Sequence, residues 1–229
     1  MITTHNISTG IPALDNLLNG GLPSYEISLI YGKATSGKTT LALSVALQHL
    51  KNYPASKITY IDSDNKLKHV RLSQIARNIA PYILNRLYLH TPQTYTQQTR
   101  LIQEIPLTLQ PEDLIVIDSI TGLYRVETGN EEQTFKINKE LNRQLGYIKE
   151  MALTSKITFI LIGQVRSILD QSGIEPVAPR LLNYWSHTII KMEKTPNPTQ
   201  RQVTIEKPLL SPNSIYLSIT DHGLEEVTH

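Results

Sequence analysis

The sequence predicts an α/β fold in which a mostly parallel sheet is flanked by helices and carries an antiparallel edge toward its C-terminal end. Short β-rich segments alternate with helical patterns as far as residue 162, and strands joined through helices run parallel. Beyond that point no convincing helical pattern appears, and the remaining strand patterns are separated only by turn residues. The chain is also 40% hydrophobic and 18% charged, with scattered Gly and Pro, which argues against disorder.

The first expected element is a short helix over 11–18, which follows a Ser-Thr-Gly cap and ends at two glycines. Four strand–helix pairs follow, over 26–31 and 38–50, 58–61 and 68–78, 87–90 and 95–104, and 114–117 and about 132–154, before a strand over 157–162. Strands over 188–193, 202–206 and 215–220 predict hairpins that extend the sheet. Two polar stretches, 121–130 and 165–181, are expected to be irregular.

Length and composition limit the classes of protein. The 229 residues suffice for one large domain or two small ones, and we predict a single domain over 1–229. The charge balance is 22 − 20 = +2, so affinity for nucleic acid would come from local patches. The lack of cysteine excludes disulfides, thiolate zinc sites, iron–sulfur clusters and a cysteine nucleophile. No apolar run of about 18 residues and no signal-like start is present, so we expect a cytoplasmic protein without a membrane partner.

Residues 32–39 read GKATSGKT and match the phosphate-loop pattern G-x-x-x-x-G-K-[ST]. The match is strong because the loop follows a predicted strand and opens a predicted helix. In such a loop the backbone N–H groups cradle phosphates, Lys38 reaches the β and γ phosphates, and Thr39 ligates Mg²⁺. The candidate cofactor-binding residues are Gly32, Lys33, Ala34, Thr35, Ser36, Gly37, Lys38, Thr39 and Thr40.

Polar residues end three of the predicted strands, at the sheet edge where open α/β sheets bind ligands. Asp118 ends LIVID, a position from which a carboxylate holds Mg²⁺ beside phosphates. The strand KITYID brings Asp62, Ser63 and Asp64 to its carboxyl end, and one of these could orient an attacking water. Gln164 follows ITFILIG, where its amide could contact a γ-phosphate and water or serve only as a buried cap. Position alone leaves those two roles of Gln164 open.

Other chemistries find little support. The histidines are scattered without the spacing of a zinc site, and no nucleophile elbow is present. The pair Tyr184-Trp185 could stack on bases, but a buried or interfacial aromatic pair is the commoner role of such residues.

The chain resembles the RecA superfamily, and specifically the archaeal RadB-type paralogues of the RadA recombinase. The resemblance covers essentially the whole chain and is carried by STGIPALDNLLNGGLP, GKATSGKT, YIDSD, LIVIDSITGLYRVE, LIGQV and, in the tail, LLNYWSHTIIKMEK and SITDHGLEEV. It implies a RecA-like P-loop NTPase core. The N-terminal helical DNA-binding domain of RadA has no room in this sequence.

The resemblance also implies roles for individual residues. It implies ATP and Mg²⁺ as cofactors, bound by Lys38, Thr39 and Asp118, with Gln164 as the γ-phosphate sensor and Arg71 near the adenine. Arg125 falls at the start of the first DNA-binding loop, while Arg166 and Arg180 fall in the second, over 165–181.

Three departures from the family pattern weaken these functions. The water-activating glutamate is replaced by Asp64, one methylene shorter, which predicts slow hydrolysis. The first loop is crowded by the acidic residues Glu127, Glu131 and Glu132. In the second loop, Asp170 and Glu175 oppose the charge of the two arginines. We therefore predict weak binding of single-stranded DNA. The basic stretch expected after the C-terminal hairpin is reduced to Lys207, either a solvated lysine or a contact to a neighbouring subunit's nucleotide.

Together these features predict a weak DNA-related ATPase that assists a strand-exchange recombinase in recombination and DNA repair. The resemblance implies a RadA-type recombinase and a Holliday junction resolvase as partners, and a small homo-oligomer is plausible. Three alternatives stay open. The first is an autonomous strand-exchange recombinase, the second is a regulatory RecA-like ATPase of the clock or signalling type that does not bind DNA, and the third is a purely structural protein.

Overall fold

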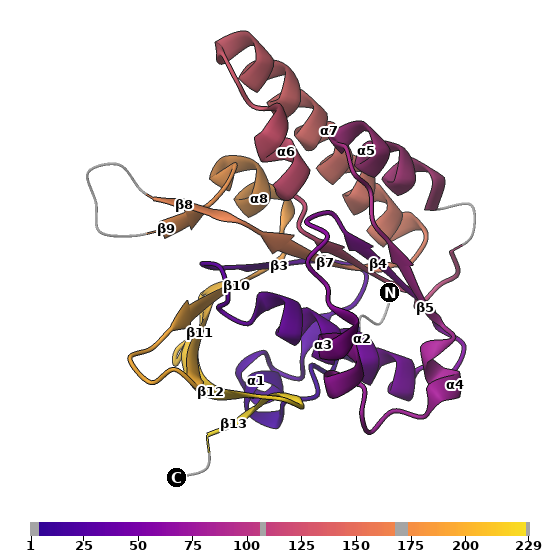
Figure 1. The fold of residues 1–229 in the computed structure, drawn as a ribbon, viewed down its shortest axis with the longest axis vertical. Helices are drawn as coiled ribbons and strands as arrows, with labels where there is room; N and C mark the ends of the chain where they lie inside the picture. The colour runs from indigo at the N-terminus through magenta and orange to yellow at the C-terminus, as the bar shows by residue number, and fades with distance from the viewer. Residues whose placement is uncertain (1–4, 106–108, 168–173, 228–229) are drawn as a thin grey trace.

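A nine-stranded sheet forms the centre of the computed structural model, which describes residues 5–105, 109–167 and 174–227 (Figure 1). Its strands are β3 (Ile27–Tyr31), β4 (Ile58–Asp62), β5 (Leu87–His90), β6 (Leu114–Asp118), β7 (Thr158–Gly163), β10 (Thr188–Lys194), β11 (Gln200–Lys207), β12 (Ser214–Thr220) and β13 (Gly223–Glu226). Their spatial order is β13-β12-β11-β10-β3-β7-β6-β4-β5. The strands from β10 to β5 pair in parallel, whereas β10 to β13 pair as antiparallel hairpins. The predicted parallel sheet with an antiparallel C-terminal edge is therefore confirmed.

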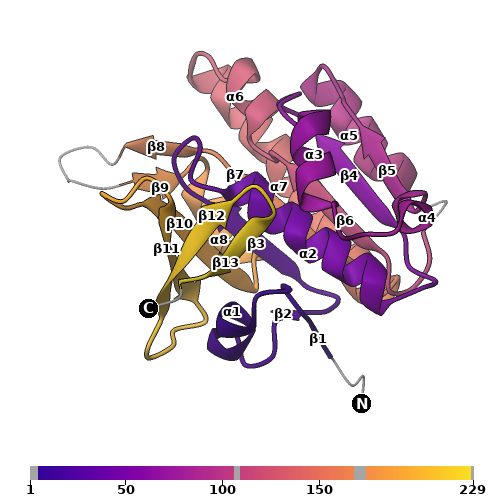
Figure 2. The ribbon, with the colours of Figure 1, turned by 60° about the horizontal axis from the view of Figure 1, so that its bottom comes forward.

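Helices cover both faces of the sheet (Figures 1 and 2). One face packs against α1 (Pro12–Leu17), α2 (Lys38–Asn52), α3 (His69–Ile75) and α4 (Pro81–Leu84). The other packs against α5 (Tyr95–Glu104), α6 (Gly122–Glu127), α7 (Glu131–Thr154) and α8 (Pro179–Trp185). The hairpin strands β12 and β13 lie beside α1 and α2, so α2 is covered on several sides. That burial explains why its sequence is apolar nearly all round.

The central strands are buried on both faces and send alternate side chains into two apolar layers. On β3, Leu29 faces the layer of α5 and α7, whereas Ile30 faces the layer of α2. On β7, Leu161 and Ile162 divide in the same way. At about 25 cal/mol per Å² of apolar surface, these two layers supply the main stabilisation of the fold.

Local side-chain contacts define the helix starts. The Thr94 hydroxyl accepts from the Gln97 N–H at the start of α5, which begins and ends as the sequence predicts. Asn130 and Gln133 form a capping box at the start of α7. The start of α1 differs from the predicted cap, because Ser8 and Thr9 do not cap the helix. Instead, the Asp15 carboxylate within α1 accepts from the Ser8 hydroxyl and the Thr9 N–H, and so fixes the turn that precedes the helix.

Both stretches expected to be irregular contain regular structure. The stretch 121–130 contains α6, and 165–181 contains the hairpin strands β8 (Val165–Ser167) and β9 (Ile174–Pro176) and the start of α8. The expectation that no helix follows residue 162 is therefore wrong. A further two-stranded ladder, β1 (Asn6–Ile7) with β2 (Leu22–Pro23), lies near the N-terminal end of the described chain. None of the described helices is long and apolar enough to cross a membrane.

The strand register defines where a site can form. Asp62 pairs with Asp118, Asp118 with Ile162, and Tyr31 with Gly163. The carboxyl ends of β3, β7, β6 and β4 therefore meet at one edge, where the residues that follow each strand come together.

Candidate functional site

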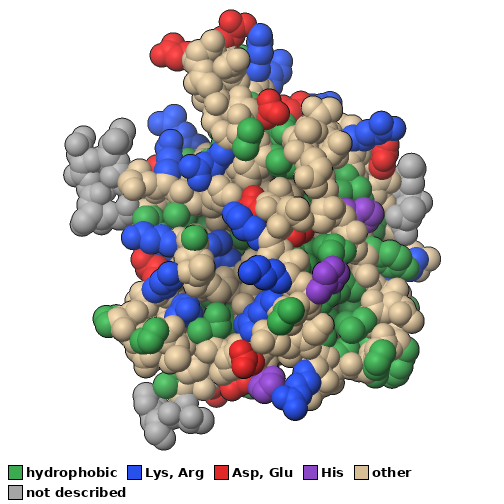
Figure 3. Space-filling view, viewed as in Figure 1, with side chains coloured by type: hydrophobic (Ala, Val, Ile, Leu, Met, Phe, Trp, Pro, Cys, Tyr) green, Lys and Arg blue, Asp and Glu red, His purple; other side chains and the backbone are tan. Residues whose placement is uncertain are grey.

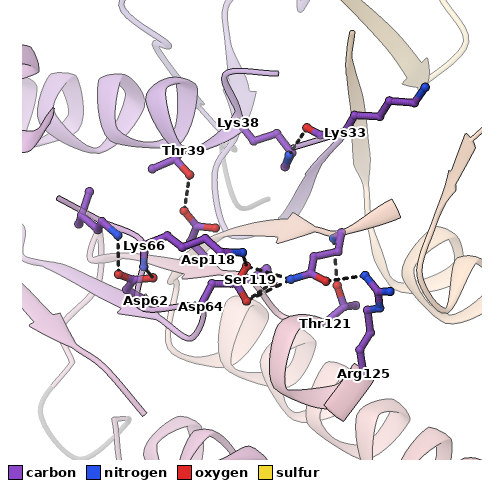
Figure 4. A network of polar contacts seen from close by, with 12 residues as sticks. Lys33, Lys38, Thr39, Asp62, Asp64, Lys66, Asp118, Ser119, Thr121 and Arg125 are labelled. Carbon is purple, nitrogen blue, oxygen red and sulfur yellow. Dashed lines mark hydrogen bonds and ion pairs between the residues drawn. The ribbon is translucent and has the colours of Figure 1, made fainter. Parts of the chain in front are cut away.

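The loop from Gly32 to Thr39 connects β3 to the N-terminus of α2. Gly37 has φ of 100°, in the left-handed region that favours glycine, and a Cβ on Gly32 would lie 2.1 Å from the Met192 carbonyl oxygen. The Lys38 ammonium donates to the carbonyl oxygens of Gly32 and Lys33, both at 2.8 Å (Figure 4). Burial lowers the pKa of Lys38, while the nearby carboxylates Asp118 and Asp64 oppose that shift.

Thr39 and Asp118 bring two oxygen ligands together at the start of α2. The Thr39 hydroxyl donates to Oδ2 of Asp118 at 2.6 Å, and the Tyr60 hydroxyl donates to the same oxygen at 2.9 Å. Burial raises the pKa of Asp118, and the two hydroxyl donors oppose that shift. A hydroxyl and a carboxylate beside a phosphate loop are hard oxygen donors of the kind Mg²⁺ prefers, so these residues fit the ion.

Asp64 and Gln164 lie in direct contact beside this pair. Gln164 Nε2 lies 3.1 Å from Oδ1 and 2.9 Å from Oδ2 of Asp64. Lys66 forms an ion pair with Oδ2 at 2.9 Å, and the Ser119 hydroxyl lies 3.3 Å from Oδ1 (Figure 4). A Cβ on Gly122 would fall 1.9 Å from Oδ1. The Asp64 carboxylate therefore occupies space that only a glycine at position 122 leaves free.

The same glutamine reaches Arg125 on α6. Gln164 Oε1 accepts from Nη1 of Arg125 at 2.9 Å, and the Gln164 N–H donates to the Thr121 hydroxyl at 3.0 Å. A chain of polar contacts thus runs from Lys66 through Asp64 and Gln164 to Arg125. The Gln164 side chain thus contacts two charged side chains, and its assignment to a γ-phosphate stays a prediction.

The three predicted DNA-contacting arginines line one cavity of about 760 Å³. Arg125 comes from α6, Arg166 from β8 and Arg180 from α8. Arg166 forms an ion pair with Glu175 of β9 at 2.9 Å, as the opposing charges in the sequence predict. Asp170 lies outside the described residues.

Comparisons with known proteins identify the family of this chain. The family described as Rad51 matches residues 2–227. The chain belongs to the Rad51 family. "DNA repair and recombination protein RadB" of Thermococcus gammatolerans is 34% identical over 228 residues, which is 97% of this chain and 99% of that protein. The RadB of Methanosphaera stadtmanae is 33% identical over 93% of this chain and 92% of its own.

A solved structure titled "Crystal structure of the RadB recombinase" is similar with a TM-score of 0.80 and 32% identity. It covers 97% of this chain and 100% of that one. The sequence resemblance to RadB-type paralogues and the RecA-like fold are therefore confirmed. Membership places the chain among the recombination and repair proteins of the RecA/Rad51 family, whose members bind a nucleotide with Mg²⁺.

Arg71 lies next to the phosphate loop in this RadB-type chain. Its Nη2 donates to the Thr40 hydroxyl at 3.2 Å, and its Nη1 donates to the carbonyl oxygens of Thr220 and Asp221 at 3.0 and 3.1 Å. Arg71 thereby connects α3 to the start of α2 and to the β12–β13 hairpin.

Lys207 has a role that the sequence did not reveal. Its ammonium donates to the carbonyl oxygens of Asn183 and Ser186, at 3.2 and 2.6 Å. Both carbonyls lie at the C-terminal end of α8, where a positive charge is favourable. Lys207 is therefore an intramolecular helix cap, neither a plain solvated lysine nor free to contact a neighbouring subunit in this conformation.

Trp185 of the aromatic pair is docked on α7. Its Nε1 donates to Asn142 at 2.9 Å, and its ring lies against Gly146. Tyr184 packs edge-on against it with ring centroids 5.0 Å apart and is 75% exposed. The pair therefore anchors α8, which favours the interfacial role over base stacking.

Three residues that sequence reasoning missed complete the site: Tyr60, Lys66 and Arg201. Tyr60 and Lys66 bind the carboxylates of Asp118 and Asp64. Arg201 lines a pocket of about 310 Å³ beside the phosphate loop. One signal was available for Arg201, because it alternates with the apolar residues Val203 and Ile205 and so shares the buried face of its strand.

Proposed function

We propose that this chain is an ATP-binding protein of DNA repair and recombination that hydrolyses ATP slowly and acts as an accessory to a strand-exchange recombinase. The observation that carries the nucleotide-binding part is the meeting of Lys38, Thr39 and Asp118 at the N-terminus of α2, with the hydroxyl and the carboxylate 2.6 Å apart. A phosphate loop with both a lysine and a metal-ligating pair fits a nucleoside triphosphate.

Each residue of the nucleotide site would have its own role in binding the phosphates and Mg²⁺. Lys38 would exchange its two loop carbonyls for β- and γ-phosphate oxygens, since an ammonium gains more from an anion than from neutral carbonyls. Thr39 and Asp118 would hold Mg²⁺, which neutralises charge on the phosphates. Tyr60 keeps the Asp118 carboxylate oriented through its hydrogen bond.

Slow hydrolysis is supported by the contacts that occupy the Asp64 carboxylate. A residue that activates water needs a free carboxylate oxygen within hydrogen-bond reach of that water. Here Gln164 contacts both oxygens of Asp64, and Lys66 forms an ion pair with one of them. Asp64 is also one methylene shorter than glutamate, and a misplacement of about 1 Å costs on the order of a hundredfold in rate.

Weak, nucleotide-gated binding of single-stranded DNA is supported by the arginine cavity. Arg125, Arg166 and Arg180 line it, and Lys and Arg side chains extend across the left and centre of the face in Figure 3. Arg125 also contacts Gln164, which joins the cavity to the nucleotide site. A γ-phosphate that drew the Gln164 amide toward itself would release Arg125 for a DNA phosphate.

A RadA-type recombinase and a Holliday junction resolvase are the partners that we propose from the family resemblance, with a small homo-oligomer as the form in which the chain acts. The names of the similar RadB proteins, which specify DNA repair and recombination, support this role. The contacts within the nucleotide site would then change when ATP binds, and the partner would bind one of the two resulting conformations.

The test is a direct measurement of ATP binding together with steady-state hydrolysis, with and without single-stranded DNA. Tight Mg²⁺-dependent binding with little turnover is the expected result, and Lys38→Ala should abolish binding without unfolding the protein. Strong stimulation by DNA would instead indicate an autonomous strand-exchange recombinase. Identical DNA binding by the parent chain and Arg125→Ala, at background level, would indicate a regulatory ATPase.

A further inference from the structure

Arg201 on β11 is a buried cation without a matching anion. Its side chain is 7% exposed, and no carboxylate among the described residues lies within ion-pair distance of it. Buried charges are normally paired, because removing a charge from water is costly unless an opposite charge compensates. The missing counterion is therefore a feature that needs a physical explanation.

The hydrogen bonds of Arg201 satisfy only part of its guanidinium. Nη1 donates to the carbonyl oxygens of Pro198 and Gln200, at 2.8 and 2.7 Å. Nε has no partner among the described residues, although it is buried. The two carbonyls fix the orientation of the guanidinium and leave its charge uncompensated.

The position of Arg201 shows which anion would compensate it. Together with Ile219, the arginine faces the phosphate-loop residues Gly37, Lys38, Thr39 and Thr40 across the pocket of about 310 Å³. The Arg201 side-chain carbon Cγ lies 3.9 Å from the point where a Cβ of Gly37 would be. The N-terminal turn of α2 also lines this pocket, and such a turn can present backbone N–H groups to the α and β phosphates of a nucleotide.

A second cation increases the positive charge at this place. Lys194 of β10 is paired with Arg201 across the antiparallel ladder, and like charges directly opposite each other are destabilising. An anion in the pocket would relieve this repulsion. The phosphate loop supplies a third cation, Lys38. The bound phosphates would therefore lie between a cation from α2 and the cations of the β10–β11 hairpin.

We infer that Arg201 is a further nucleotide-binding residue, which contacts the α- and β-phosphate part of the nucleotide from the side opposite the phosphate loop. The inference rests on the proposed nucleotide binding and adds a residue to it. Because ATP and ADP share this diphosphate, Arg201 strengthens the binding of both, whereas Asp64 and Gln164 act at the γ-phosphate end.

The test is calorimetric titration of the full chain with ATP and with ADP, each with Mg²⁺. Arg201→Gln should weaken both nucleotides by the same factor, roughly tenfold or more, as expected for the loss of a hydrogen bond to a charged group. Arg201→Lys keeps the charge and should bind both within about threefold of the parent chain. Arg100→Gln is the matched control, because Arg100 is an exposed arginine of α5 paired with Glu104.

The outcomes separate this inference from the proposed function. Absence of ATP binding by the parent chain would overturn both. Normal ATP binding by the parent and undiminished binding by Arg201→Gln would overturn the role of Arg201 alone, as would a loss confined to ATP. If Arg201→Gln does not fold, Arg201→Met, which keeps the aliphatic stem, takes its place. Equal losses in the Met and Lys variants would show that Arg201 only braces its turn.

Discussion

Gln164 holds Asp64 with its side-chain amide, at 2.9 Å from one carboxylate oxygen and 3.1 Å from the other. The glutamine follows β7 and the aspartate follows β4, with β6 between these strands. In this arrangement the amide that we assign to the γ-phosphate and the carboxylate that we assign to water are bound to each other. ATP binding would have to separate them before either could act.

Lengthening Asp64 should accelerate hydrolysis. In Asp64→Glu the extra methylene carries the carboxylate beyond Gln164 and toward the phosphates, so we expect kcat to rise by up to about a hundredfold. Asp64→Asn is the control, because it keeps the size of the side chain and removes its charge, and it should stay at or below the parent rate. The measurement is phosphate release at saturating ATP. An unchanged rate in Asp64→Glu would show that the length of this residue does not limit hydrolysis.

DNA binding should depend only weakly on salt. With two to four phosphates neutralised, the slope of log K against log salt for single-stranded DNA should be about −1.5 to −3. Fluorescence anisotropy with a labelled oligonucleotide at several salt concentrations measures this slope. A slope steeper than about −6 would indicate more phosphate contacts than the three arginines can make.

Glu175→Gln should strengthen DNA binding. It removes the carboxylate that pairs with Arg166 at 2.9 Å, and so frees that guanidinium for a phosphate. We expect a several-fold rise in affinity at low salt, and the rise should vanish in the double variant with Arg166→Gln. Glu140→Gln, which removes the ion-pair partner of Arg143 on α7, is a matched control outside the cavity.

Arg86 should contribute strongly to stability. Its guanidinium donates to the carbonyl oxygens of Leu50, Tyr53 and Ser56 at and beyond the C-terminal end of α2. Arg86→Met should lower the free energy of unfolding by about 2 kcal/mol, because carbonyls at a helix end lose their donors. Urea denaturation measures the change, with Arg77→Met as a comparison. Equal stability of the two variants would contradict the capping role of Arg86.

The elements that the sequence predicts correctly are those whose structure is decided by a local pattern. The helix α5 has its N-cap Thr94 directly before its ten residues, which carry the apolar spacing of a helix. The loop from Gly32 to Thr39 needs only its own glycines and the flanking strand and helix. These signals are short-range, so they can be read without knowing the tertiary structure. The order of the parallel strands then places Asp118, Asp64 and Gln164 at one edge.

The elements and contacts that the sequence does not predict are those decided by tertiary packing. The helix α8 has seven residues, which are too few to show a helical period, and is held by the packing of Trp185 on α7. Likewise, Gln164 as a partner of Asp64, and Thr39 and Tyr60 as partners of Asp118, come from other strands and loops. No spacing along the chain reveals these contacts. Arg201 could have been noticed, because an arginine in the buried register of a strand conflicts with its apolar neighbours. Such a conflict between residue type and position often marks a functional site.

Acid should destabilise the protein through His49. This side chain of α2 is buried, stacks on Tyr53 with ring centroids 4.5 Å apart, and lies 2.7 Å from the Glu112 carbonyl oxygen through Nε2. Burial lowers the pKa of His49 below its ordinary value of 6.5. The unfolded chain therefore takes up a proton near pH 6.5 before the folded protein does, so this contribution to stability is present above that pH. It is lost as the pH falls toward the lower pKa of the folded state.

The measurement for His49 is the free energy of unfolding in urea at pH 7.5 and pH 5.5. We expect the parent chain to lose more stability between these values than His49→Gln, whose amide can still donate to the Glu112 carbonyl but does not titrate. The comparison uses the difference between the two pH values within each protein, so a lower overall stability of the variant does not affect it. Parallel losses in the two proteins would show that other groups cause the acid sensitivity.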